Sequence, residues 1–261
     1  MAVSALSLLR RWVNDYFNRH DDEAARTFIA PDYALHIGDV VFKGRDESWL
    51  PAVAEQMRLF PGLGMTVHQT LAGETWAAAW FSEHGASNGR VACWSGVSIY
   101  FSDGERLIRC IAQEDYLTRQ RQLKSGVADV VESPTPAPWD VEPLPRDEVA
   151  EAAVRRWLQS SWPPEKADVR CDDEHITRTP LRFEVSGVEI DALYSSGPDV
   201  VFHARQTGVY LGGLAGVDAK GQTASLDVNG ILRVVDGDVQ SGRIIRDRVG
   251  LRVALRKGAT R

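Results

Sequence analysis

The chain has 261 residues, a formal net charge of −6 and a hydrophobic fraction of 44%. This length exceeds the roughly 100 to 150 residues most common for one domain, so we expect two domains, each with its own core. The negative charge provides no basic surface for nucleic acid or for an anionic membrane, and we expect neither partner. Three scattered cysteines, and an N-terminal apolar stretch too short for a signal sequence or a membrane span, favour a cytoplasmic protein.

The first half is predicted to place helices before strands. Apolar side chains recur at helical spacing over residues 8–17, and further helices are expected over 23–29 and 48–60. Strands are predicted at 33–37, 40–42, 65–71, 75–82, 90–101 and 107–116. Helices followed by an antiparallel sheet are typical of an α+β domain.

Prolines crowd residues 126–146, a density that disfavours regular structure and indicates a linker. We therefore expect a first domain over residues 1–125 and a second over 147–261. The second is predicted to begin with a helix near 147–158. Its strands are predicted at 183–185, 189–194, 200–207, 226–235 and 243–249.

Short motifs recur in the same order in both halves. Arg10-Arg11-Trp12 and Arg155-Arg156-Trp157 each lie in a predicted helix. Each half then has a strand that ends in Asp-Gly and a later aspartate: Asp103-Gly104 and Asp115 in the first, Asp236-Gly237 and Asp247 in the second. Such self-similarity indicates two related domains.

These motifs carry a family resemblance. The segments at 206–213, 234–239 and 243–251, and their first-half counterparts around Glu83, Phe101 and Ile111, resemble SnoaL-like polyketide cyclases of the NTF2-like superfamily. The resemblance implies two cone-shaped α+β domains, each a curved antiparallel sheet wrapped around N-terminal helices. It also implies an apolar pocket between the sheet and the first helix, and a pseudo-dimer of the two domains that can still form a larger homo-oligomer.

Asp115 is the leading catalytic candidate. By the period of two it shares one strand face with Arg109 and Gln113, so a carboxylate lies beside a cation and an amide. The resemblance implies that this aspartate is the acid and base of an intramolecular aldol closure, which requires a pKa tuned toward neutrality. The alternative is a surface aspartate paired with a neighbouring arginine.

Asp247 and Tyr210 are the second-domain counterparts. Three arginines crowd Asp247, which favours an ion pair over catalysis there. The first domain is therefore expected to be the active one.

His36 is the second catalytic candidate, because it falls close to the place where the resembling ketosteroid isomerases carry a carboxylate base. Trp12 stands near the place of the isomerases' hydrogen-bonding tyrosine, and Tyr16, one helical turn later, can supply the phenol instead. A half-buried structural histidine is the alternative for His36.

The candidate substrate-binding residues form a mainly aromatic set. Trp76 and Trp80 face one way on a predicted strand, Trp94 adds apolar area, and Glu83, His84 and Gln113 add polar groups. Aromatic residues at alternate strand positions also fit an ordinary core.

The sequence has no dinucleotide fingerprint, phosphate loop, zinc motif or serine elbow, so we expect no cofactor and no metal. The predicted function is cofactor-independent acid/base chemistry on an apolar, oxygenated small molecule: aldol-type cyclisation, isomerisation or dehydration. Two alternatives stay open, an epoxide hydrolase with an Asp-Arg-Asp relay and a non-catalytic small-molecule-binding or assembly domain.

Overall fold

The computed structural model describes residues 3–159 and 167–258. The chain forms two compact units. The N-terminal unit comprises Met1–Ala112 and Thr118–Leu144, and the C-terminal unit comprises Gln113–Leu117 and Pro145–Arg261. The limits expected from the sequence, residues 125 and 147, stay a prediction, since residues 113–117 group with the second unit.

The N-terminal unit opens with three helical segments, α1 (Ala5–Arg11), the π-helix η1 (Trp12–Phe17) and α2 (Asp22–Phe28). Asp21 caps α2, because its side chain accepts a hydrogen bond from the amide of Ala24. A second π-helix, η2 (Arg45–Trp49), leads into α3 (Leu50–Leu59), and α4 (Tyr116–Ser125) follows the sheet.

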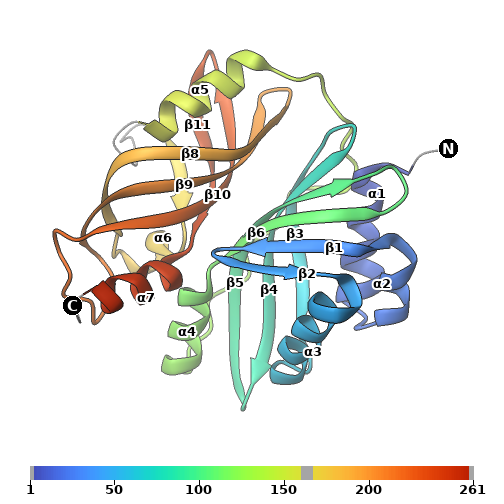
Figure 1. The fold of residues 1–261 in the computed structure, drawn as a ribbon, viewed down its shortest axis with the longest axis horizontal. Helices are drawn as coiled ribbons and strands as arrows, with labels where there is room; N and C mark the ends of the chain where they lie inside the picture. Colours follow the sequence, from blue (N-terminus) through green and yellow to red (C-terminus); the bar gives the residue numbers. More distant parts are fainter. Residues whose placement is uncertain (1–2, 160–166, 259–261) are drawn as a thin grey trace. The chain divides into compact units, whose positions relative to one another are not determined.

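The six-stranded sheet of this unit has the order β2-β1-β6-β5-β4-β3 (Figure 1). Its strands are β1 (Ile29–Ile37), β2 (Val40–Lys43), β3 (Gly64–Ala72), β4 (Trp76–Ser87), β5 (Arg90–Ser102) and β6 (Leu107–Glu114). The expectation of a purely antiparallel sheet needs one correction, because β1 pairs with β6 in parallel. A long connection separates these two strands in the chain, and only such connections allow parallel pairing.

The C-terminal unit repeats this plan. Its five-stranded sheet has the order β7-β11-β10-β9-β8, which matches β1-β6-β5-β4-β3, and β7 pairs with β11 in parallel. The strands are β7 (Asp168–Cys171), β8 (Arg182–Ser196), β9 (Asp199–Gly212), β10 (Thr223–Val235) and β11 (Asp238–Arg246), and the helices are α5 (Glu148–Gln159), α6 (Glu174–Thr177) and α7 (Arg248–Gly258). The predicted fold class, α+β with two related sheets, is confirmed.

Two phenylalanine–glycine pairs fix the correspondence between the units. Phe81 on β4 is paired with Gly96 on β5, and Phe202 on β9 is paired with Gly230 on β10. A Cβ atom on Gly96 would lie 2.3 Å from the Phe81 ring, and one on Gly230 would lie 2.6 Å from the Phe202 ring. In both units a ring lies over a glycine of the next strand, so β4 corresponds to β9 and β5 to β10.

We call the sheet surface that packs against the first helix of each unit its inner face. In the C-terminal unit, Val154 and Leu158 of α5 share the core cluster with Val200, Phe202 and Val228 of the sheet. Helix and sheet together thus enclose one core in each unit.

Candidate functional site

Aromatic rings from the first helix and from the sheet meet on the inner face of the N-terminal unit. The Trp12 ring lies 5.9 Å from the Tyr16 ring and 5.5 Å from the Tyr100 ring, measured between centroids. The Tyr16 ring lies 5.1 Å from that of Trp49. These four side chains are buried. Water therefore has little access to this part of the inner face.

Three polar atoms in this apolar setting have no hydrogen-bond partner among the described residues: Nε1 of Trp12, Oη of Tyr16 and Oγ of Ser98. The Tyr16 side chain has no exposed surface, and Ser98 shares the strand face of Tyr100, two residues away. An unsatisfied buried polar group costs stability, and a cluster of them calls for an explanation.

Glu83 brings a carboxylate to the same inner face. It is only 3% exposed, lies opposite Trp94 in the β4–β5 pairing, and accepts a hydrogen bond of 2.9 Å from Nε2 of Gln56. Burial raises the pKa of Tyr16 well above its ordinary value, and the charges of Asp22 and Glu83 raise it further. The phenol therefore stays protonated at neutral pH, as a hydrogen-bond donor close to a carboxylate.

The structure does not bring Tyr16 together with His36 and Asp115. The Tyr33 ring contacts Trp49 and its hydroxyl contacts Cys110, so Cys110 faces inward. Ile111 follows Cys110 on β6, so its side chain points to the opposite, outer face. His36 pairs with Ile111 and therefore lies on that outer face too. Gln113 and Asp115 follow Ile111 at the same period of two and belong to that outer face.

Asp115 lies instead in a buried ionic cluster of the C-terminal unit. Its Oδ1 accepts a bond of 2.5 Å from Nη2 of Arg248, whose Nη1 donates to Asp173 at 2.8 Å. Arg246 pairs with Asp172 and with Glu174 beside them. Burial raises the pKa of Asp115. The positive charge of Arg248 lowers this pKa, but the negative charges of Asp172 and Asp173 raise it, and it stays above its ordinary value. Asp115, Arg248 and Asp173 thus form an Asp-Arg-Asp arrangement.

The candidates of the second half have structural contacts. Asp247 accepts a hydrogen bond of 2.8 Å from the amide of Gly250 and so caps α7. Tyr210 accepts one of 3.0 Å from the amide of Leu214 and holds the glycine-rich loop.

The three sheet tryptophans do not line one pocket. Trp94 lies on the inner face, 5.5 Å from the Phe60 ring. Trp80 lies on the opposite face, 5.0 Å from the His68 ring, and Trp76 shares that face by the strand period. Only Trp94 can therefore contact a ligand at the inner face.

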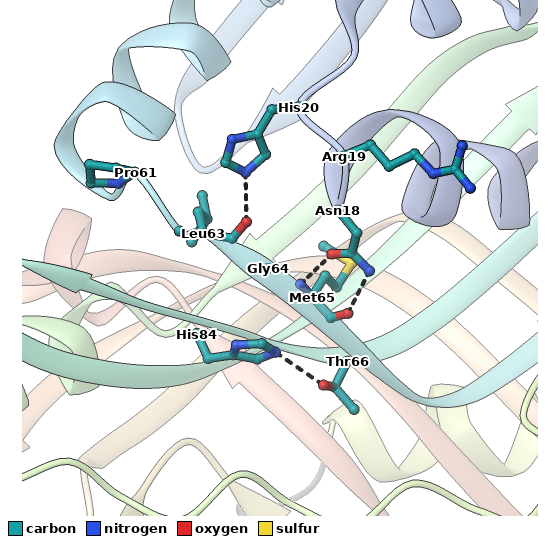
Figure 2. Close-up of a pocket in the computed structure, with 10 residues that line it drawn as sticks. Asn18, Arg19, His20, Pro61, Leu63, Gly64, Met65, Thr66 and His84 are labelled. Atoms are coloured by element: carbon teal, nitrogen blue, oxygen red, sulfur yellow. Dashed lines mark hydrogen bonds between the residues drawn. The ribbon is translucent and has the colours of Figure 1, made fainter.

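His84 lines a separate pocket of about 430 Å³ at one end of the sheet. Figure 2 shows this pocket: His84 and Thr66 lie on one side of the Leu63–Met65 segment, and His20 lies on the other. His84 is bonded to Thr66 at 3.1 Å and His20 to the carbonyl of Leu63 at 2.7 Å. Burial lowers the pKa of His84, so this imidazole is neutral at pH 7.

Sequence reasoning missed two residues of the inner face. Ser98 could have been found from strand alternation, because it shares a face with Trp94 and Tyr100. Gln56 is brought to Glu83 only by the packing of α3 on the sheet, and no local pattern indicates that contact.

A family model describes the first of the two units. Residues 9–110 match the model of the SnoaL-like domain. The N-terminal half is a SnoaL-like domain. The inner-face residues Trp12, Tyr16, Glu83 and Ser98 all lie within the matched SnoaL-like segment. The predicted resemblance is therefore confirmed for this half.

Solved structures show a similar fold at low identity. IdmH from Streptomyces antibioticus, assigned as a polyketide cyclase, is 21% identical over 45% of this chain and 96% of its own, with a TM-score of 0.42. A polyketide cyclase assigned in Acidithiobacillus ferrooxidans is 20% identical over 49% and 100%, with a TM-score of 0.42. An LEH-like epoxide hydrolase of M. tuberculosis is 12% identical over 48% and 92%, with a TM-score of 0.40. Among curated proteins, none matches this chain.

Among the described residues, no helix is long and apolar enough to cross a membrane. Across residues 3–159 and 167–258, His, Cys, Asp and Glu side chains form no group of three or more suited to hold a metal ion.

Proposed function

We propose that the SnoaL-like domain is a cofactor-independent acid/base catalyst. Its substrate would be an apolar oxygenated small molecule of polyketide, terpenoid or steroid-like character. The reaction would be an aldol-type cyclisation, an isomerisation or a dehydration. One observation carries the proposal: Trp12 Nε1 and Tyr16 Oη are buried donors without hydrogen-bond partners among the described residues, their rings lie 5.9 Å apart, and the charge of the buried Glu83 acts on Tyr16.

The chemistry follows from these groups. A substrate carbonyl oxygen accepts hydrogen bonds from Tyr16 and Trp12, while the Glu83 carboxylate removes a proton from the adjacent carbon. The electron pair of the broken C–H bond moves to the carbonyl oxygen, and the two donors stabilise the resulting enolate. The enolate carbon then attacks a second carbonyl of the substrate, whose oxygen takes the π electrons and the proton from Glu83, or the enolate takes that proton back at another carbon.

The surroundings favour this step. The donors are fixed by ring packing, and Gln56 holds the carboxylate by its side-chain amide. Exclusion of water strengthens hydrogen bonds to a developing charge. The apolar rings of Trp49 and Tyr100 suit an apolar substrate body.

Proton exchange into a simple ketone tests the proposal without knowledge of the substrate. We expect the protein to accelerate exchange of the α-protons of 2-tetralone in D₂O, followed by NMR. Glu83→Gln should slow it by about 100- to 10,000-fold, and Tyr16→Phe by about 100- to 1,000-fold.

Tyr33→Phe and Asp115→Asn are the matched controls, because Tyr33 belongs to the same ring cluster and Asp115 lies on the other face. Both should leave the rate within about threefold of the unmodified protein, well under the roughly 100-fold loss that removal of a catalytic group produces. An unmodified protein that does not accelerate exchange, yet binds 2-tetralone, would favour the non-catalytic binding domain instead.

Epoxide opening is a second candidate, favoured by the Asp115–Arg248–Asp173 arrangement. Two residues before Asp115 the buried Oε1 of Gln113 lacks a hydrogen-bond partner in the described structure. In this alternative, Asp173 takes a proton from a water held by Gln113, and the water oxygen attacks an epoxide carbon. The epoxide C–O bond breaks, and its oxygen takes the proton of Asp115, whose raised pKa suits an acid.

Hydrolysis of cyclohexene oxide to the diol separates the two candidates. If the second is correct, Asp115→Asn abolishes diol formation while Glu83→Gln retains it. If the first is correct, the protein forms no diol above the uncatalysed rate.

A further inference from the structure

Gln206 is the least satisfied buried side chain of the C-terminal unit. Its side chain has no exposed surface, and neither Oε1 nor Nε2 has a hydrogen-bond partner in the described part of the chain. A primary amide offers two donor hydrogens and an acceptor, all of which water would satisfy in the unfolded chain. Burying them unpaired opposes folding.

The fold satisfies comparable groups elsewhere in the same sheet. Asn229 on β10 bonds to His203 at 2.7 Å, and Asp227 bonds to Arg205 at 2.8 Å. These residues lie on the outer face, opposite the core. The unpaired amide of Gln206 therefore contrasts with the paired polar groups of the outer face.

The position of Gln206 follows from the phenylalanine–glycine correspondence. Because Phe202 corresponds to Phe81, Ala204 stands at the position of Glu83 and Gln206 at that of Gly85. Gln206 thus lies one strand period, about 7 Å, beyond the place where the other unit carries its carboxylate. Since Gly85 has no side chain, the shared fold does not require a polar group at this position.

The residues that the strand register places beside Gln206 on the inner face are apolar. It is paired with Leu226 on β10 and with Val188 on β8, and on its own strand the inner-face neighbours are Ala204 and Gly208. A charged ligand group would be poorly solvated among these residues. A flat neutral group with a donor beside an acceptor would satisfy both atoms of the amide by two parallel hydrogen bonds.

We propose that the C-terminal unit holds a second ligand site centred on Gln206, for a neutral molecule with a carboxamide or lactam edge and an apolar body. The site has no ionisable group at the position of Glu83, so it binds its ligand without acid/base chemistry. This inference stands independently of the function proposed for the SnoaL-like domain.

Benzamide is the probe, tested by NMR on the full chain with ¹⁵N-labelled glutamine. We expect the Gln206 side-chain NH₂ signals, assigned by their loss in Gln206→Met, to shift saturably with benzamide. Benzoate, which is charged, and toluene, which has no amide, should leave them in place. Benzamide should also raise the Tm of the unmodified protein and of Tyr16→Phe, but not that of Gln206→Met.

Three results would overturn the site. One is an absence of saturable shifts in the unmodified protein, which needs no folded variant to interpret. Another is an equal rise in Tm with Gln206→Met, or with Gln206→Leu if the methionine variant fails to fold. A nuclear Overhauser contact between the Gln206 amide and a long-lived water, unchanged by benzamide, would likewise show that the amide binds only water.

Discussion

The two units share a strand order and a phenylalanine–glycine packing motif, but their inner faces differ in polarity. Where the N-terminal unit has Glu83 and Ser98, the corresponding positions of the C-terminal unit are Ala204 and Leu232. At these two positions the second face builds the same sheet with apolar residues. The comparison teaches that the fold does not require the polar groups of the first face, so their cost in stability points to a role in binding or chemistry.

The charged groups are distributed in the opposite way. The C-terminal unit contains the buried cluster of Arg246, Arg248, Asp172 and Asp173, in which the acids and bases pair with one another. In the first unit, the buried carboxylate of Glu83 accepts a hydrogen bond of 2.9 Å from the side-chain amide of Gln56. The buried charges of the C-terminal unit thus pair with one another, and the proposed function assigns the carboxylate of Glu83 to a ligand.

The largest effect on stability is expected from Arg246→Met. The guanidinium is 1% exposed and bonds to Asp172 at 2.6 Å, so its loss removes one of the two arginines that pair with this buried carboxylate. We expect a decrease of about 3 to 5 kcal/mol in the free energy of unfolding, measured by urea denaturation. Arg233→Met, which breaks the exposed pair with Asp199, should cost about 1 kcal/mol or less. Similar losses for both variants would contradict the structural role of the cluster.

The shared packing motif predicts parallel losses in the two units. Gly96→Ala and Gly230→Ala each force a methyl group against a phenylalanine ring. Each substitution should destabilise the protein by about 1 to 3 kcal/mol, because neither ring can move without opening the core. Thermal unfolding of the two variants measures this. If one substitution is harmless, the correspondence between the units is wrong at that place.

Two tyrosines should respond differently to removal of the hydroxyl. Tyr210 accepts a hydrogen bond from Leu214, so Tyr210→Phe should lower the free energy of unfolding by about 1 kcal/mol. Tyr16→Phe removes an unpartnered group and should leave stability unchanged or raise it by up to about 1 kcal/mol. Equal losses in urea denaturation would mean that the Tyr16 hydroxyl has a structural partner.

The smallest effect concerns acid stability in the C-terminal unit. Although burial opposes ionisation of Glu151, hydrogen bonds from Arg146 and Ser195 lower its pKa below the ordinary 4.5. The unfolded chain therefore binds the proton first, and this contribution to stability is present above pH 4.5 and lost as the pH falls through the lowered pKa. Glu151→Gln should flatten the pH dependence of Tm between pH 5 and 3. An unchanged slope would show that the pair does not contribute.

Sequence alone predicted the duplication, the α+β class and most strands of the first unit, because alternation and Asp-Gly turns are local signals. It missed the helices α4, α6 and α7 and the parallel strand β7. β11 ends at Arg246 and α7 begins at Arg248. Because only one residue separates them, the strand pattern in the sequence continues into the first residues of the helix. β7 has only four residues, too few for a clear alternation in the sequence, and it is a strand because it pairs with β11.

The candidate site was predictable only in part. Tyr16, Trp12 and Glu83 were named from their positions, yet Asp115 and His36 were expected beside them. A period of two places residues on a common face but does not say which face meets the helix. The contacts of Tyr33 with Cys110 and Trp49 identify the inner face, and His36 and Asp115 lie on the other face, which points away from the first helix.

A crystal structure with 2-naphthol, the aromatic counterpart of the 2-tetralone enol, tests the central claim most directly. The account predicts that the naphthol lies on the inner face of the SnoaL-like domain, with its oxygen within about 3 Å of both Tyr16 Oη and Trp12 Nε1. Its ring should approach Glu83. A naphthol bound at the Asp115–Arg248 cluster, or excluded from the inner face while Tyr16 and Trp12 bond to fixed waters, would contradict it.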